Sequence, residues 1–381
     1  MTTGNGNTGD IYTQQRFLFM TLDPVHVGAG GYRLGRVDMT IAREPGSRLP
    51  KIPGTSLAGA IRHYASMRYN KPEAAGQHKN FRGEREKCPI IYTFGTVKEA
   101  PSAAEATSKA EPASTTEPPP TAEASSSAEP TSTPETKPAT VAKNGQAPQE
   151  VTRAGTVSIG DVCILFFPVY SMAGPVWVST VEKVTEVWGT GSVTLPEDNG
   201  QPVKPNDELV VTGLDWDKNL NVGWLLFPAK KGLQITPPSE DVKISPEWKA
   251  IAGRIVLVTE KLFSQIVNSN LEVRTSVSIK PETGAAEPHA LFTYEAIPRA
   301  TWLWCDVIED DYRKEFPHTE RQFKVVNGVG KENAGDELKP AWTRPLDVVT
   351  AGVTLIKYLG VGGMGTRGFG RMSCVAQWKE S

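Results

Sequence analysis

The stretch from Leu359 to Arg371 reads LGVGGMGTRGFGR and contains overlapping matches to the pattern G-x-G-x-x-G. A dinucleotide-binding loop with this pattern follows a strand and opens a helix. Here the order is reversed, because Leu346 to Leu359 has the apolar spacing of a helix and Phe369 to Trp378 alternates like a strand. No G-K-[ST] follows, so a P-loop is also excluded. The glycines therefore belong to a helix–loop–strand unit of another kind.

Such a loop lets a ligand approach the backbone closely, since glycine has no side chain to keep it away. Bare amides flanked by arginines suit the phosphodiester chain of a nucleic acid. A flexible turn between helix and strand is the alternative, and the spacing alone leaves both open. The predicted RNA-binding residues of the loop are Gly362, Gly363, Gly365, Arg367 and Arg371.

Strands and helices interleave along the rest of the chain, which predicts an α+β fold. The predicted strands are Arg16–Leu22, Arg36–Ala42, Val162–Tyr170, Ile255–Thr259 and Arg299–Ile308, and the predicted helices are Thr55–Tyr69 and Glu260–Val267. A long hairpin is predicted from Glu272–Lys280 and Ala290–Glu295, because Pro-Glu-Thr-Gly between them is turn chemistry.

A low-complexity segment, residues 99–150, consists mainly of Ala, Glu, Ser, Thr and Pro and has no aromatic residue. Such a segment cannot bury enough apolar surface to offset its ordering entropy, which predicts disorder. A linker between two domains is the rival interpretation. The N-terminal part alone has too few elements for a core, so we predict one domain, residues 1–98 plus 151–381, with an insertion.

Charge and cysteine content give weaker guidance. Lys and Arg total 41 against 43 Asp and Glu, but several acids lie in the insertion, so the folded part is more basic than the net charge of -2 suggests.

The four cysteines form no C-x-x-C pair, which argues against a zinc site or a disulfide framework. The opening residues lack a signal-peptide pattern, and no run of eighteen apolar residues occurs. We predict a cytoplasmic protein without a membrane partner.

Two polar segments near the N-terminus are candidates for chemistry. Thr55 or Ser56 is predicted to cap a helix whose free N–H groups could bind an RNA phosphate; an ordinary N-cap is the alternative. His26 and Asp38 flank a Gly-rich turn, where an acid could hold a divalent ion or align a 2′-hydroxyl. A surface role is the alternative for each. No nucleophile-elbow motif accompanies the Ser, His and Asp residues.

These segments together resemble the RAMP superfamily of CRISPR effector proteins, and specifically the repeated backbone subunit of the type III-B (Cmr) complex. The resemblance is carried by Pro24–Gly28, Gly35–Asp38, Pro53–Leu57, Gly160–Val169, Trp177–Val178, Glu287–Phe292 with Pro298–Arg299, and the C-terminal glycine loop. It implies a ferredoxin-like, RRM-type core, with the hairpin near residues 272–295 as a thumb.

The resemblance also implies a function. The chain would bind a CRISPR guide RNA together with further copies of itself and other Cmr subunits, and would cut complementary target RNA at regular intervals, using a divalent metal ion (Mg or Mn). Asp38 would be catalytic and a metal ligand, with His26 and Glu295 as helpers. Relatives often have a lysine where this chain has Ala58, so a contact with the guide phosphate is either missing or supplied by Lys51 or Arg62.

The sequence also allows three other hypotheses about the function. The chain could be a purely structural RNA-binding subunit, in which Asp38 is an idle surface acid. It could be the equivalent backbone subunit of the type III-A (Csm) complex. It could also be a nucleotide-binding enzyme that uses the glycine loop, although the helix-before-strand order counts against this.

Overall fold

The computed structural model describes residues 12–30, 37–76, 87–96, 154–216, 218–317 and 341–379. Residues 1–95 and 154–381 belong to one compact unit. The low-complexity segment at 99–150 lies outside the described residues. Its two flanks meet, because the amide of Thr156 donates to the carbonyl of Thr93 at 2.9 Å.

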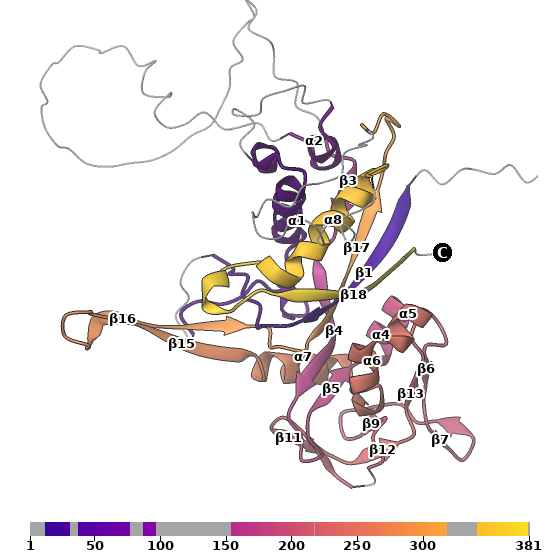
Figure 1. Cartoon of the computed structure of the whole chain (residues 1–381). Helices are drawn as coiled ribbons and strands as arrows, with labels where there is room; N and C mark the ends of the chain where they lie inside the picture. Colours follow the sequence, from indigo (N-terminus) through magenta and orange to yellow (C-terminus); the bar gives the residue numbers. More distant parts are fainter. Residues whose placement is uncertain are drawn as a thin grey trace, which may run out of the picture. The chain divides into compact units, whose positions relative to one another are not determined.

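A ten-stranded mixed sheet organises this unit, with its main strands in the order β12-β9-β14-β5-β4-β17-β1-β18 (Figure 1). Two short strands lie off this path, β2 beside β4 and β3 beside β17. The strands are β1 (Thr13–Thr21), β2 (Lys51–Ile52), β3 (Val157–Ile159), β4 (Val162–Val169), β5 (Val176–Ser179), β9 (Val210–Thr212), β12 (Ala229–Lys231), β14 (Ile255–Leu257), β17 (Trp302–Glu309) and β18 (Met372–Lys379). The four strands from β4 to β18 are antiparallel throughout.

Strand β1 shows how the sheet separates two cores. Phe17 and Phe19 lie in one apolar cluster, and Leu18 between them lies in another, as the two-residue period of a strand requires. Helices α1 (Gly54–Arg68) and α8 (Pro345–Leu359) supply the first cluster. They cross closely, since a Cβ at Gly352 would stand 2.4 Å from the carbonyl oxygen of Ile61.

The second cluster is filled largely by aromatic rings, with Phe166 and Trp302 packed against Trp188 and Trp248. Helices α4 (Val181–Trp188) and α6 (Pro246–Ile251) bring the last two to the sheet. The remaining elements near this cluster are β6 (Val193–Thr194), β7 (Glu197–Asp198), β8 (Gln201–Pro202), β13 (Gln234–Ile235) and α5 (Glu240–Ile244). The hairpin of β10 (Leu220–Val222) and β11 (Leu225–Phe227) packs into the first cluster.

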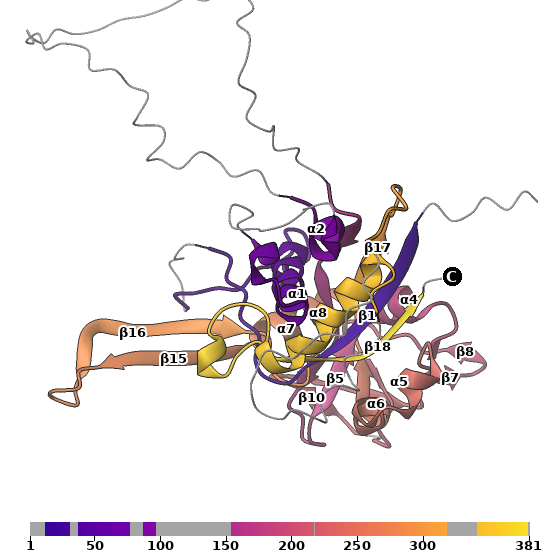
Figure 2. The same cartoon turned by 45° about the horizontal axis from the view of Figure 1, so that its top comes forward.

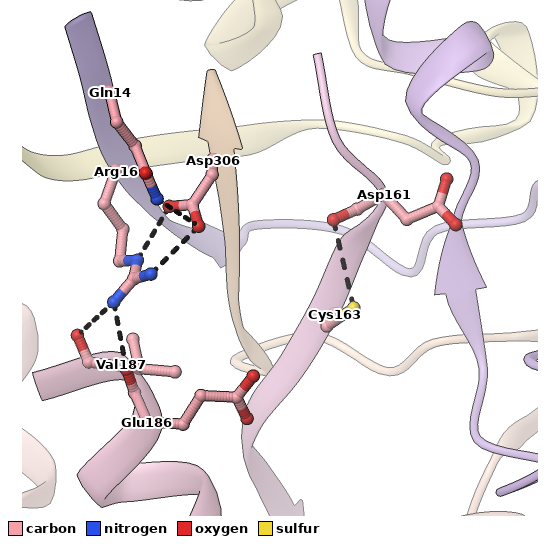
Figure 3. A network of polar contacts seen from close by, with 7 residues as sticks. All are labelled: Gln14, Arg16, Asp161, Cys163, Glu186, Val187 and Asp306. Atoms are coloured by element: carbon pink, nitrogen blue, oxygen red, sulfur yellow. Dashed lines mark hydrogen bonds and ion pairs between the residues drawn. The ribbon is translucent and has the colours of Figure 1, made fainter. Parts of the chain in front are cut away.

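A buried ion pair joins this region to the central strands (Figure 3). Arg16 donates to both carboxylate oxygens of Asp306, at 2.8 and 2.9 Å, and to the carbonyls of Glu186 and Val187 in the last turn of α4. Gln14 donates to the same carboxylate. A cation near the last carbonyls of a helix is favourable, since that end carries partial negative charge.

The predicted hairpin is present and leaves the sheet as a separate two-stranded arm (Figures 1 and 2). It follows helix α7 (Glu260–Ser269) and consists of β15 (Glu272–Ile279) and β16 (Ala286–Ala296). The strands pair from Glu272 opposite Ala296 outward to Ile279 opposite Ala286.

The α+β prediction is confirmed, but the predicted strand Arg36–Ala42 is wrong. Arg36 lies outside the described residues, and those that follow form isolated bridges to several neighbours instead of a ladder: Met39 to Tyr294, Ile41 to Gly28 and Arg43 to Pro50. Helix α2 (Pro89–Phe94) was not predicted. In the described part of the chain, no helix is long and apolar enough to cross a membrane.

Candidate nucleic-acid interface

The glycine loop packs against the segment that follows β1. The amide of Gly370 donates to the carbonyl of Pro24, and the amide of Gly363 donates to the carbonyl of His26, each at 2.9 Å. Gly362 has a φ of +91°, and a Cβ there would stand 2.4 Å from the carbonyl oxygen of His26. Glycine is therefore required at 362 both by backbone conformation and by close approach. Gly365 has no such constraint, since a Cβ would meet nothing within 4 Å.

The base of the hairpin lies against the same loop through aromatic contacts. Tyr294 and Phe369 make an edge-to-face contact at 5.3 Å, and Tyr294 also stands edge-on to His26 at 6.1 Å. The guanidinium of Arg367 lies over the ring of Phe292 at 5.3 Å, and that of Arg274 over Phe369 at 4.7 Å. The exposed Arg367 is thus held at the junction of loop and hairpin.

Asp38 is held against this junction by one residue of β16. The amide and the hydroxyl of Thr293 donate to Oδ2 of Asp38, at 2.7 and 3.0 Å, and the amide of Asp38 donates to the Thr293 hydroxyl at 3.1 Å. These hydrogen bonds, the backbone one first, lower the pKa of Asp38 from its ordinary value. Asp38 is therefore an ionised acceptor at neutral pH.

The environments of His26 and Glu295 do not favour the predicted catalytic roles. His26 is only 6% exposed, and its Nδ1 lies 2.6 Å from the carbonyl oxygen of Glu295, so Nδ1 carries a proton and donates. The Glu295 carboxylate forms an ion pair with Arg43 at 3.0 Å, with both side chains mostly buried. Both residues hold the segment in place, which leaves Asp38 as the available acid.

Three other carboxylates of this region, those of Glu295, Asp23 and Asp161, are each paired with a cation. Arg371 makes two contacts with Asp23, one of them 3.0 Å long, and this hydrogen bonding lowers the pKa of Asp23. Lys51 is paired with Asp161. Asp38 differs from these three, because its hydrogen-bond partner among the described residues is a neutral threonine. Its negative charge is not compensated by a described side chain.

The start of α1 is arranged differently from the prediction. Neither Thr55 nor Ser56 caps the helix, whose N-cap is Pro53. Instead the Asp161 carboxylate accepts the amide of Gly54 at 2.8 Å and also receives Lys51, which raises the pKa of Lys51. A negative group thus already occupies this positive helix end.

Among the helix residues predicted to contact RNA, Thr55 is exposed and Ser56 half-buried. Arg62 does not fit the prediction. It is buried, and its Nε donates to the carbonyl of Ala74 at 3.0 Å. Ala65 and Ser66, which share its side of the helix, are also buried, so this side of α1 faces protein.

A metal centre built by the protein does not fit the described residues. They contain no group of three His, Cys, Asp or Glu side chains placed to hold an ion. Asp38 would be one protein ligand, and Glu295 is already committed to Arg43. A divalent ion held by Asp38 together with phosphate oxygens of the RNA stays a prediction.

Several relevant residues had no distinctive sequence signal. Three of them bind partners far away in the sequence: Thr293 binds Asp38 across 255 residues, Arg43 binds Glu295 across 252, and Asp161 binds Gly54 across 107. Trp224 is 87% exposed on the turn between β10 and β11, whereas Trp302 and Trp342 are buried.

Comparison with known proteins agrees with this architecture. The family model described as the RAMP superfamily matches residues 18–373. The chain is 24% identical over 295 residues to the CRISPR system Cmr endoribonuclease Cmr4 of Pyrococcus furiosus, an alignment spanning 74% of this chain and 77% of that protein. A chain of the Type III-B Cmr-beta complex bound to cognate target RNA superposes with a TM-score of 0.52 at 13% identity, covering 96% of this chain and 98% of that chain. The last likeness concerns the fold alone.

Proposed function

This chain belongs to the RAMP superfamily, and from that premise we propose that it is a guide-RNA-binding backbone subunit of a type III-B CRISPR complex. The similarity to a Cmr endoribonuclease supports the assignment to type III-B over type III-A. In this role its partners are the guide RNA, the target RNA, further copies of itself and other Cmr subunits, and it works in the cytoplasm.

The order of the central elements supports a ferredoxin-like core within this proposal. Along the chain they run β1-α1-β4-β17-α8-β18, and in the sheet the strands stand in the order β4-β17-β1-β18. That is the split βαβ pattern of ferredoxin-like domains. The hairpin β15–β16 then serves as a thumb that reaches the RNA.

We further propose that the subunit cuts the target RNA and that Asp38 is the residue required. The observation that carries this proposal is the charge of Asp38, which no described side chain compensates, in a segment that packs against the glycine loop through Met39. The glycine loop and Arg367 suit a phosphodiester backbone, and RNA bound there would run near the segment that carries Asp38.

The chemistry open to Asp38 follows from its low pKa. Because Thr293 lowers the pKa of this carboxylate, it is a weaker base than a free aspartate, and its main contribution is to accept a hydrogen bond from the attacking 2′-hydroxyl and align it with the phosphorus. As the bond from the 2′-oxygen to phosphorus forms and the bond from phosphorus to the 5′-oxygen breaks, solvent water takes the 2′-hydroxyl proton and supplies a proton to the 5′-oxygen. Thr293 fixes one carboxylate oxygen and leaves the other for this contact. No step is assigned to a metal ion.

The test uses the assembled complex with a bound guide and an end-labelled complementary RNA. Wild-type complex is expected to give regularly spaced cuts, and Asp38→Ala is expected to lower the cleavage rate at least about a hundredfold. Guide binding should be unchanged, since Asp38 lies outside the apolar clusters. Parallel reactions with EDTA test the metal expectation separately.

Two outcomes would count against parts of this proposal. Binding of target without cutting by the wild type would leave a structural RNA-binding subunit. Failure of Asp38→Ala to assemble would show that the residue supports the fold.

A further inference from the structure

Asp38 and Thr293 form a reciprocal pair rather than a single contact. The Thr293 hydroxyl both donates to the Asp38 carboxylate and accepts from the Asp38 amide. Its one proton and one of its lone pairs are thereby used on the same residue. The orientation of the carboxylate and the path of the backbone at 38 are consequently set by one side chain.

The backbone next to this pair is bound to the same strand. The amide of Met39 donates to the carbonyl of Thr293 at 3.0 Å, and the amide of Glu295 donates to the carbonyl of Met39 at 3.1 Å. Arg43 then pairs with the Glu295 side chain. Thr293 and Glu295 are two residues apart on β16 and point to the same face, so this face holds the segment 38–43 at two points.

We infer that Thr293 is the positioning residue for Asp38, and that through it the base of the hairpin sets where the carboxylate stands against the RNA. This inference rests on the proposed function of Asp38. It adds that the hydroxyl at position 293, not only the strand backbone, is needed for cutting.

The chemistry of threonine suits this role. A β-branched side chain has few rotamers, so its hydroxyl is held in direction with little loss of entropy. Valine has nearly the same shape and lacks the hydroxyl, while serine keeps the hydroxyl. The pair Thr293→Val and Thr293→Ser therefore separates the hydrogen bonds from the packing.

The experiment measures single-turnover cleavage by the assembled complex and, separately, backbone amide hydrogen exchange of residues 37–43 in the full-length chain. For Thr293→Val we expect cleavage to slow about tenfold at saturating target, because two hydrogen bonds that orient Asp38 are lost. Target affinity should stay within about twofold, and exchange at 37–43 should quicken. Thr293→Ser should restore both readouts, which a role in packing alone would not allow.

Thr194→Val is the matched control, because Thr194 is an exposed strand residue in β6, outside the proposed interface. It should leave both readouts unchanged. If complexes with Thr293→Val cleave at the wild-type rate while separate complexes with Asp38→Ala are inactive, the inference is overturned and the proposed function stands. If the wild type does not cut, the proposed function fails, and hydrogen exchange alone still decides whether the hydroxyl holds Asp38. Unchanged exchange would overturn that point as well.

Discussion

Two aspartates of this protein, Asp306 and Asp38, are held in opposite ways. The Asp306 carboxylate accepts hydrogen bonds from Nε and Nη2 of Arg16 and from the side-chain amide of Gln14 (Figure 3). Nη1 of Arg16 extends this network to the last turn of α4. Asp38 receives only the amide and hydroxyl of Thr293 from the described residues. The first carboxylate is neutralised and mostly covered, and the second keeps its charge beside an exposed loop.

The difference separates structural from reactive carboxylates within one fold. A buried ion pair holds two layers together, because removing either partner leaves the other as an unpaired buried charge, which destabilises the fold. A carboxylate held by neutral donors is oriented without being neutralised, so its charge stays available to a ligand. By this criterion Asp23, Asp161 and Glu295 belong with Asp306.

The largest expected change concerns the structural side of the comparison. Arg16→Met keeps most of the apolar side chain but leaves Asp306 without its cation and the end of α4 without its donor. We expect the free energy of unfolding to fall by about 3–5 kcal/mol, as measured by urea denaturation. Lys249→Met removes an exposed charge from α6 and should have almost no effect. A loss below about 1 kcal/mol for Arg16→Met would mean that the ion pair is not structural.

The next change tests whether the glycine loop is shaped by its contact with His26. Gly362→Ala puts a methyl group against the His26 carbonyl at a positive φ, and we expect a destabilisation of about 2 kcal/mol or a displaced loop. Guide-RNA affinity should fall accordingly in a filter-binding assay. Gly253→Ala, at a position outside the loop where a Cβ would meet nothing within 4 Å, is the control. Equal effects of the two substitutions would contradict the assigned geometry.

The smallest change concerns Asp161, which stands at the start of α1. Asp161→Asn weakens the contacts to Lys51 and Gly54, and we expect a loss of about 1 kcal/mol, because this side chain is 42% exposed and solvent screens the pair.

The pH dependence of this loss has a definite sign. Lys51 and the Gly54 amide lower the pKa of folded Asp161 below its unfolded value. Its contribution is thus complete above about pH 4 and disappears as pH falls through the folded pKa. Thermal unfolding at pH 7 and pH 3 should show the wild type losing its advantage over Asp161→Asn at the lower pH. An advantage that persists at pH 3 would argue against this role.

Local patterns were sufficient to predict most elements. The apolar spacing of Leu346 to Leu359 predicted α8 to within one residue, and the turn chemistry of residues 281–284 predicted the hairpin. The strand predicted after Arg36 was wrong, although apolar and polar residues do alternate there, because the backbone of this segment bridges to a different partner every two residues. Alternation reports which side chains are buried and says nothing about whether one partner strand runs alongside.

The site was less predictable than the fold. Asp38 was selected through the family resemblance, and the partner that orients it is 255 residues further along the chain. Arg62 looked available on a helical face, yet its side chain enters the protein and bonds to Ala74. Pairing partners at such separations follow from tertiary packing, which residue types and spacing do not encode locally.

The most direct test of the distinction between the two aspartates compares Asp38→Asn with Asp306→Asn in the same guide-loaded complex, following target cleavage and thermal unfolding of each. Both substitutions remove a charge at constant shape. We predict that Asp38→Asn slows cleavage at least about a hundredfold with unchanged thermal stability, and that Asp306→Asn lowers stability while the folded complex still cuts. Cleavage by Asp38→Asn at the wild-type rate would contradict the account.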